Sequence, residues 1–152
     1  MHPSYHSIAI FVDNIEISKT FYTEVLGLEI EYDFGKNVIM RGGITLWEIN
    51  PHHIIPEKLG ISSVSGNTGN RFELYFETEN IDDINEKVRL SGSEFLHSLH
   101  EEPWGQRTIR FFDPDRHLIE IGESLETFIK RLNHSGMSAI EVAGKTSVPL
   151  EK

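Results

Sequence analysis

The chain has 152 residues, 38% of them apolar, as expected for one domain or two small halves that share a core. Its formal net charge is −10. The negative charge argues against nucleic acid and anionic membranes as partners, since both attract basic patches. There is no cysteine for a disulfide or a thiolate site, no apolar run long enough for a bilayer and no recognisable signal peptide, so we expect a cytoplasmic protein.

The first half of the chain predicts a strand, then a helix, then two or three short strands. Residues 5–12 favour a strand, with Ile8, Ile10 and Val12 on one face and Ala9 and Phe11 on the other. Asp13 or Asn14 can cap the following helix, and Gly27 is placed to end it. The short strands lie between Leu28 and Ile49.

The second half predicts the same order. Residues 50–70 are rich in Pro, Gly, Ser and Asn and form the best candidate linker. A strand begins at RFELYFET (71–78), and the next helix has Ile81, Ile84 and Val88 on one stripe and ends near Gly92. Three further strands are predicted around Phe95–Leu99, Thr108–Phe112 and His117–Ile121.

Matching residues indicate an internal repeat. Residues 13–15 (DNI) match 79–81 (ENI), and TLWEI (45–49) matches HLIEI (117–121). The sequence therefore predicts an α+β fold of two βαβββ modules, about residues 5–49 and 71–123. Their curved mixed sheets would surround a shared cleft within one domain, residues 1–123.

Residues 124–152 lie outside the repeat. An apolar stripe at helical spacing predicts one helix, and Ser138 with Glu141 fits a capping box for a second. We expect a helical extension that packs on the domain or on a second subunit, and we expect a homodimer. The stripe consists of Leu125, Phe128, Ile129 and Leu132.

Each of TLWEI and HLIEI admits one acid into an apolar strand, and an unpaired buried carboxylate is costly. If equivalent strands meet at a cleft, the first and last strands of the two modules supply His6, Glu48, Glu73 and Glu120. One imidazole and three carboxylates suit a divalent ion such as Ni²⁺, Mn²⁺, Co²⁺ or Fe²⁺, and Zn²⁺ also accepts carboxylate oxygens.

Two motifs resemble one known family. HSIAIFVDNIEISKTFYTEVLGL (6–28) is similar to the opening signature of the vicinal oxygen chelate superfamily, and PWGQRTIRFFDPDRHLIEIGE (103–123) to its closing signature. The superfamily includes glyoxalase I, bleomycin resistance proteins and extradiol dioxygenases. The resemblance implies metal-ligand roles for His6, Glu48, Glu73 and Glu120, with Glu73 in place of the His that glyoxalase I usually has.

Ordinary structural roles compete with the metal site. His6 could be a histidine at a strand edge, and Glu73 could lie on a solvated face of its strand. Glu48 could pair with a basic side chain such as Arg107 or Arg110.

The leading functional hypothesis is a glyoxalase-I-like, metal-dependent isomerase or lyase (a lactoylglutathione-lyase-like enzyme) acting on a small oxygen-chelating substrate. Glu120 or Glu48 would shuttle the proton beside the metal. The alternative is a non-catalytic small-molecule binding or resistance protein of the same fold. A metal-dependent dioxygenase is less favoured, because these positions hold one His rather than two.

Overall fold

The computed structural model describes residues 1–66 and 71–149. The chain divides into two compact units, each described by itself below. The first comprises Met1–Arg71 with the turn Asp113–Arg116, and the second comprises Phe72–Phe112 with His117–Lys152. Each unit combines a four-stranded mixed sheet with helices, which confirms the predicted α+β class.

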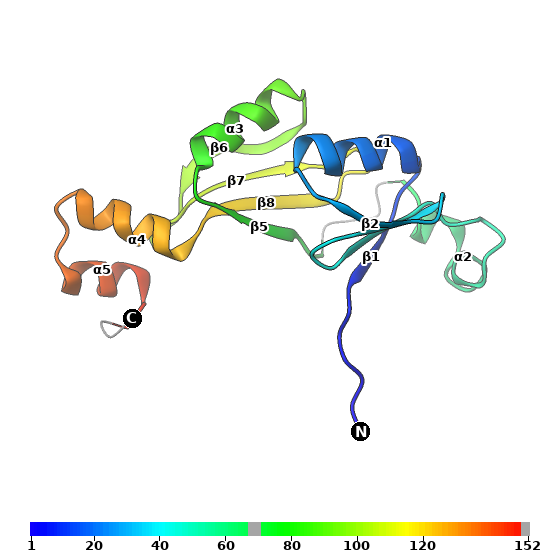
Figure 1. Cartoon of the computed structure of the whole chain (residues 1–152), viewed down its shortest axis with the longest axis horizontal. Helices are drawn as coiled ribbons and strands as arrows, with labels where there is room; N and C mark the ends of the chain where they lie inside the picture. Colours follow the sequence, from blue (N-terminus) through cyan, green and yellow to red (C-terminus); the bar gives the residue numbers. More distant parts are fainter. Residues whose placement is uncertain (67–70, 150–152) are drawn as a thin grey trace. The chain divides into compact units, whose positions relative to one another are not determined.

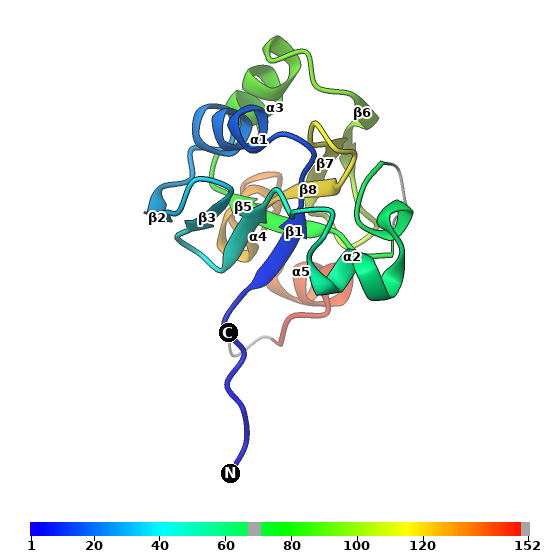
Figure 2. The same ribbon diagram turned by 90° about the vertical axis from the view of Figure 1, so that its right-hand side faces the viewer.

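The sheet of the first unit has the order β1-β4-β3-β2, with β1 parallel to β4 and the other pairs antiparallel (Figures 1 and 2). The Asn14 side chain accepts hydrogen bonds from the first N–H groups of α1 and so begins the helix. Val38 and Leu46 are completely buried in the core. The elements are β1 (Ile8–Phe11), α1 (Ile15–Thr20), a π-helical turn (Phe21–Val25), β2 (Ile30–Asp33), β3 (Asn37–Met40) and β4 (Ile44–Trp47).

The predicted linker contains local structure of its own. Within residues 50–70 the chain forms α2 (Ile54–Leu59) and a 3₁₀ turn (Ile61–Ser63), while 67–70 lie outside the described residues. The His53 ring accepts a hydrogen bond from the N–H of Ile55 and thereby caps α2. This stretch, rich in proline and glycine, therefore forms short helical turns.

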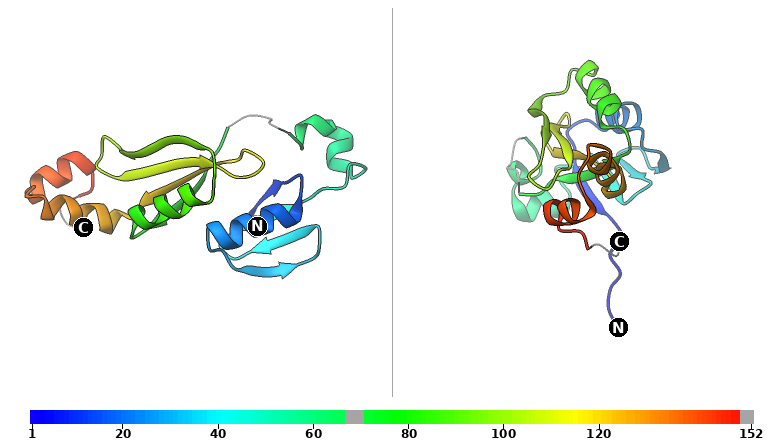
Figure 3. Two further views of the ribbon diagram at one scale, coloured as in Figure 1. Left: turned by 90° about the horizontal axis from the view of Figure 1, so that it is seen from above. Right: turned by 90° about the vertical axis from the view of Figure 1, so that its left-hand side faces the viewer.

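The second unit repeats the topology of the first. Its strand order is β5-β8-β7-β6, in which each strand takes the place of its counterpart in the order β1-β4-β3-β2 (Figure 3). This match confirms the internal repeat. TLWEI and HLIEI thus belong to equivalent strands, β4 and β8. The elements are β5 (Leu74–Thr78), α3 (Ile81–Leu90), β6 (Phe95–Glu101), β7 (Arg107–Phe112) and β8 (Leu118–Glu123).

The C-terminal extension is a helical hairpin of α4 (Leu125–His134) and α5 (Ala139–Thr146), which begins directly after β8. The predicted capping box of Ser138 and Glu141 is present. Phe128 and Leu132, half of the stripe that suggested a dimer surface, are buried against α5. The homodimer stays a prediction. Among the described residues, no helix is long and apolar enough to cross a membrane.

Candidate functional site

A row of polar side chains crosses the second sheet. The strand registers place Tyr75 opposite Glu120, Glu120 opposite Arg110, and Arg110 opposite His97. Arg107 on β7 forms an ion pair with Asp82 of α3, so the odd-numbered side chains of β7 face that helix. Because successive side chains of a strand alternate between faces, Arg110 and its row lie on the other face. We call this the polar face.

Arg110 is the centre of the polar face. Its Nη2 contacts Glu120 Oε1, its Nε lies 3.5 Å from Glu73 Oε2, and its Nη1 lies 2.8 Å from Glu102 Oε1. The same Nη1 donates to His97 Nε2 at 3.1 Å. One guanidinium therefore serves three carboxylates. We call these five residues the Arg110 cluster.

The contacts of His97 define its protonation. A guanidinium can only donate, so Nε2 of His97 accepts from Arg110 and carries no proton. The other ring nitrogen, Nδ1, then carries the proton and donates to the carbonyl of Ser98 at 2.8 Å. His97 is thus a second partner of the guanidinium, beside the carboxylates.

The carboxylates of the cluster differ electrostatically. Burial of Glu120, which is 5% exposed, and the nearby carboxylate of Glu73 raise its pKa, although Arg110 opposes the shift. Burial also acts to raise the pKa of Glu102, but hydrogen bonds from Arg110 and Thr108 outweigh it and hold that pKa below its ordinary value. Glu120 is thus the acid that holds its proton to higher pH.

A hydrogen-bonded chain continues across the polar face. Trp104 Nε1 donates to Gln106 Oε1, Gln106 Nε2 donates to the Tyr75 hydroxyl, and that hydroxyl donates to Glu77 Oε2. Burial and the hydrogen bond to Glu77 raise the pKa of Tyr75 to about 12. Trp104 and Tyr75 are 40% and 46% exposed, so both offer ring surface to a ligand.

Two of the four predicted metal ligands meet in this cluster. Glu73 stands just before β5 and Glu120 lies within β8, and both contact Arg110. Of the other two, His6 is exposed and precedes β1. The four-residue metal site stays a prediction. Its two residues from the second unit, Glu73 and Glu120, both contact Arg110.

Glu48 has a structural task in the first unit. Its Oε2 accepts from the N–H of Ile15 at 2.9 Å, at the start of α1, and its Oε1 lies 2.9 Å from Lys36 Nζ. These two contacts, the backbone hydrogen bond first, hold the pKa of Glu48 below its ordinary value. Its basic partner is thus Lys36, rather than Arg107 or Arg110 as considered from the sequence.

Glu48 and Glu120 lie on different faces of their own sheets, relative to the helix of each unit. The N–H of Glu48 bonds to the carbonyl of Lys36, which extends the β3–β4 ladder by one step beyond Trp47. Glu48 therefore shares a face with buried Leu46 and reaches the helix side of its sheet. Glu120 lies on the sheet face away from its helix. In this respect Glu48 resembles Glu123, which sequence reasoning did not single out.

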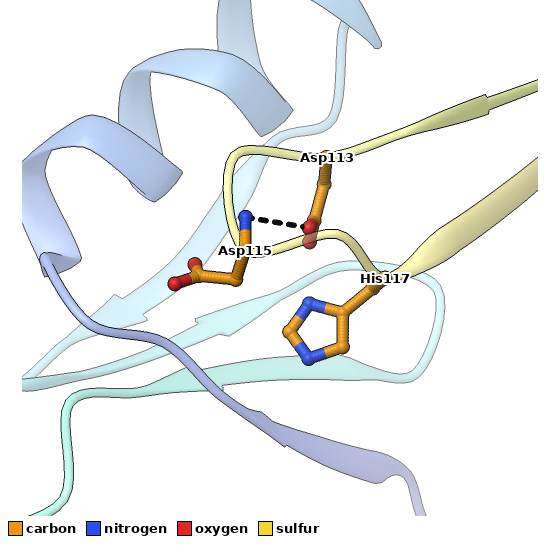
Figure 4. A group of neighbouring side chains, drawn as sticks. All are labelled: Asp113, Asp115 and His117. Carbon is orange, nitrogen blue, oxygen red and sulfur yellow. Dashed lines mark hydrogen bonds between the residues drawn. The ribbon is translucent and has the colours of Figure 1, made fainter. Parts of the chain in front are cut away.

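A second group with metal-ligating side chains lies in the turn between β7 and β8. One ligand atom each of Asp113, Asp115 and His117 lies within 4.8 Å of the others (Figure 4). Sequence reasoning used this DPDRH stretch only as a family signature. The alternation of Asp, Asp and His is the signal that could have marked it.

The two aspartates of this turn already have donors. Asp113 accepts from the N–H of Asp115 at 2.9 Å and from the Tyr22 hydroxyl at 2.7 Å. Asp115 accepts from the N–H of Asp13 at 3.0 Å and from the Ser18 hydroxyl at 3.3 Å. All four carboxylate oxygens are thus hydrogen-bonded, so the turn has a sufficient structural explanation.

Residues 5–126 match the glyoxalase-like domain family. Among solved structures, a protein of unknown function from Agrobacterium tumefaciens is 36% identical, with 82% of this chain and 97% of that chain covered and a TM-score of 0.69. A glyoxalase/bleomycin resistance protein/dioxygenase from Nocardioides is 24% identical (83% and 86% covered, TM-score 0.63). A lactoylglutathione lyase from Agrobacterium tumefaciens is 20% identical (80% and 93% covered, TM-score 0.57).

The last two likenesses support the fold alone. No sequence among the curated proteins matches the chain. The family match covers most of the chain and agrees with the repeated βαβββ topology. The chain therefore belongs to the glyoxalase-like domain family, in agreement with the resemblance of its two motifs to the vicinal oxygen chelate superfamily.

Proposed function

We propose that this protein binds a small organic molecule with a positively charged group on the polar face of its second unit. The observation that carries the proposal is the Arg110 cluster, in which three carboxylates share one guanidinium. This is the small-molecule-binding alternative that the sequence analysis sets beside the leading isomerase or lyase hypothesis.

Charge determines the class of ligand. Glu73, Glu102 and Glu120 place three carboxylates beside one guanidinium, and His100 Nε2 lies 3.6 Å from Glu102 Oε2. A ligand ammonium group would relieve the repulsion between the carboxylates. The exposed ring surfaces of Tyr75 and Trp104 would contact the apolar part of the ligand and attract its cation.

The test compares two ligands of similar size and opposite charge. We expect 2-phenylethylamine at millimolar concentration to raise the melting temperature, and 3-phenylpropionate at the same ionic strength to leave it unchanged. Glu73→Gln, which removes one negative charge at a partly exposed position, should reduce the effect of the amine. Stabilisation by the carboxylate alone would show that Arg110 receives anions and would refute the proposal.

A second candidate is the isomerase or lyase activity, which the raised pKa of Glu120 favours. A buried carboxyl whose pKa is raised above its ordinary value is better suited than an ordinary glutamate to take and return a proton. A divalent ion, when bound, would polarise the substrate oxygens, and Glu73 and Glu120 would be two of its ligands.

The observed contacts do not fit that ion as they stand. Arg110 occupies Glu73 and Glu120, and both oxygens of Glu48 are engaged. We therefore assign only the proton transfer, to Glu120. Exchange of the carbon-bound protons of dihydroxyacetone in D₂O, followed by NMR with and without Mn²⁺, measures it. Exchange that is absent from wild type, or unchanged in Glu120→Gln, would remove this candidate.

A further inference from the structure

We propose that Arg110 is a built-in competitor for divalent metal. Its guanidinium occupies the carboxylates of Glu73 and Glu120, two of the four metal ligands that the sequence predicts. This inference goes beyond the binding of an organic ligand, because it says why the polar face disfavours a metal ion and which single residue is responsible.

The geometry supports a specific occupation of both acids. Nε of Arg110 faces Glu73, Nη2 faces Glu120, and Nη1 is shared by Glu102 and His97. All three nitrogens of the guanidinium therefore have partners. The side chain is only 21% exposed, so these contacts are poorly screened by water.

The same contacts provide Arg110 with a second position. A divalent ion bound by Glu73 and Glu120 would displace Nε and Nη2, because one carboxylate pair cannot serve both cations closely. Arg110 would keep Glu102, at 2.8 Å, and His97, at 3.1 Å. Metal binding is therefore weakened by the lost arginine contacts without being forbidden, and Glu102 determines how easily Arg110 leaves.

Glu73 is the residue at which this chain departs from the glyoxalase I pattern, and it contacts Arg110. A carboxylate at this position, where glyoxalase I usually has His, adds one negative charge to the pair with Glu120. Arg110 supplies one positive charge directly beside both. The arginine thus balances the charge that Glu73 adds, which makes the two residues a compensating pair.

The experiment measures Mn²⁺ affinity by calorimetry and by electron paramagnetic resonance, independently of any activity. We expect Arg110→Met to bind Mn²⁺ at least about tenfold more tightly than wild type, a difference of about 1.4 kcal/mol. Glu102→Gln should weaken the binding that wild type shows, because Arg110 loses its second position. In the Arg110→Met background, Glu102→Gln should have no such effect. Arg89→Met, which removes an exposed arginine paired with Glu86 on α3, is the matched control and should bind as wild type does.

Two results would overturn the inference that Arg110 competes with metal, and a third would overturn the role of Glu102. Equal affinity of wild type and Arg110→Met would show that the arginine does not compete. Absence of binding in both would show that something other than Arg110 excludes metal, and would leave the organic-ligand proposal untouched. An equal effect of Glu102→Gln in both backgrounds would remove the role of Glu102. If Arg110→Met does not fold, Arg110→Lys, which keeps the charge but not the forked contacts, should bind Mn²⁺ more tightly than wild type, and failure to do so counts against the proposal.

Discussion

Two buried glutamates of β8, Glu120 and Glu123, lie three residues apart on opposite faces of the same strand and have opposite electrostatic environments. Glu123 is 1% exposed and accepts from the N–H of Arg107 at 2.8 Å, from Arg131 Nη2 at 2.8 Å and from Arg107 Nη2 at 3.3 Å. Glu120 is 5% exposed and shares one guanidinium with two other acids. Burial alone therefore does not distinguish them.

The two glutamates differ in the number of arginines that contact each carboxylate. Burial acts to raise the pKa of Glu123, but Arg131, the backbone N–H of Arg107 and the Arg107 side chain outweigh it and leave that pKa lowered. Two arginines contact the carboxylate of Glu123 and make a structural anchor that ties α4 to β7 and β8, while Arg107 also pairs with Asp82 and Arg131 with Glu101. One arginine for three carboxylates leaves excess negative charge and a raised pKa at Glu120, which are properties of a binding or proton-transfer site.

The largest expected effect comes from breaking the anchor. Glu123→Gln removes the charge that Arg107 and Arg131 share, and losing one partner of a buried ion pair costs roughly 3–5 kcal/mol. Both arginines are about 30% exposed, with side-chain values of 28% and 31%, so we expect about 3 kcal/mol at pH 7. Urea unfolding followed by circular dichroism measures it.

Glu86→Gln is the matched control, because the ion pair of Glu86 with Arg89 is exposed to solvent and should contribute little to stability. If the two variants lose similar stability, the anchor interpretation of Glu123 is wrong.

The second prediction concerns packing on the polar face. A Cβ on Gly122 would collide with the amide of Gln106, whose side chain is buried. The Gln106 amide donates hydrogen bonds to the Tyr75 hydroxyl and to the carbonyl of Glu123. We expect Gly122→Ala to lower the free energy of unfolding by about 2 kcal/mol, within the range for overpacked sites. It should also shift the pKa of Tyr75, which absorbance titration near pH 12 can follow.

Gly144→Ala serves as the control for Gly122→Ala. Its Cβ would meet nothing within 4 Å, and Gly144 lies within α5. Alanine should therefore stabilise the helix by about 0.5–1 kcal/mol. Loss of stability in both variants would indicate a general intolerance of substitution at glycine and not a specific contact with Gln106.

The sequence predicted the fold through its local signals. The caps at Asn14 and Ser138 formed as expected, and so did the strand predicted within residues 5–12. These features depend on near neighbours in the chain, and the repeat supplied the topology. The family signatures agreed with both.

The site could be predicted only in part. HLIEI correctly identified Glu120 as an acid inside an apolar strand, and Glu73 joined it. The alignment of TLWEI with HLIEI paired Glu48 with Glu120, although the pleat places Glu48 on the helix side. Residue counting cannot detect this difference, because it arises from strand registers and loop lengths. Arg110, which meets its partners from three other strand regions, had no local signal at all.

A third, smaller effect tests the assignment of Glu48. Its carboxylate accepts an N–H at the start of α1, as an N-cap side chain does, so Glu48→Ala should cost about 1 kcal/mol. Lys36→Ala removes only an ion pair in which the lysine is 70% exposed, and should cost less than about 0.5 kcal/mol. Urea unfolding of both variants checks the order. A larger loss for Lys36→Ala would mean that the ion pair, and not the helix contact, determines the role of Glu48.

The smallest effect, and the most specific, is that of Glu120→Gln on the pH dependence of stability. Because the pKa of Glu120 is raised on folding, the folded chain binds more protons than the unfolded chain between the ordinary pKa, about 4.3, and the raised value. The free energy of unfolding that Glu120 contributes is therefore fully present below the ordinary pKa and falls as pH rises through the raised pKa.

Glutamine resembles the protonated acid and does not titrate. Glu120→Gln should therefore match wild type near pH 4 and be equal or more stable at pH 7, by up to about 1 kcal/mol. Glu123 has the opposite sign, since its lowered pKa gives stability above the ordinary value that is lost as pH falls. Urea unfolding of wild type and both Gln variants from pH 4 to 8 separates the two glutamates. If Glu120→Gln instead loses stability relative to wild type as pH rises, Glu120 is well neutralised by Arg110, and the contrast between the two faces of β8 does not hold.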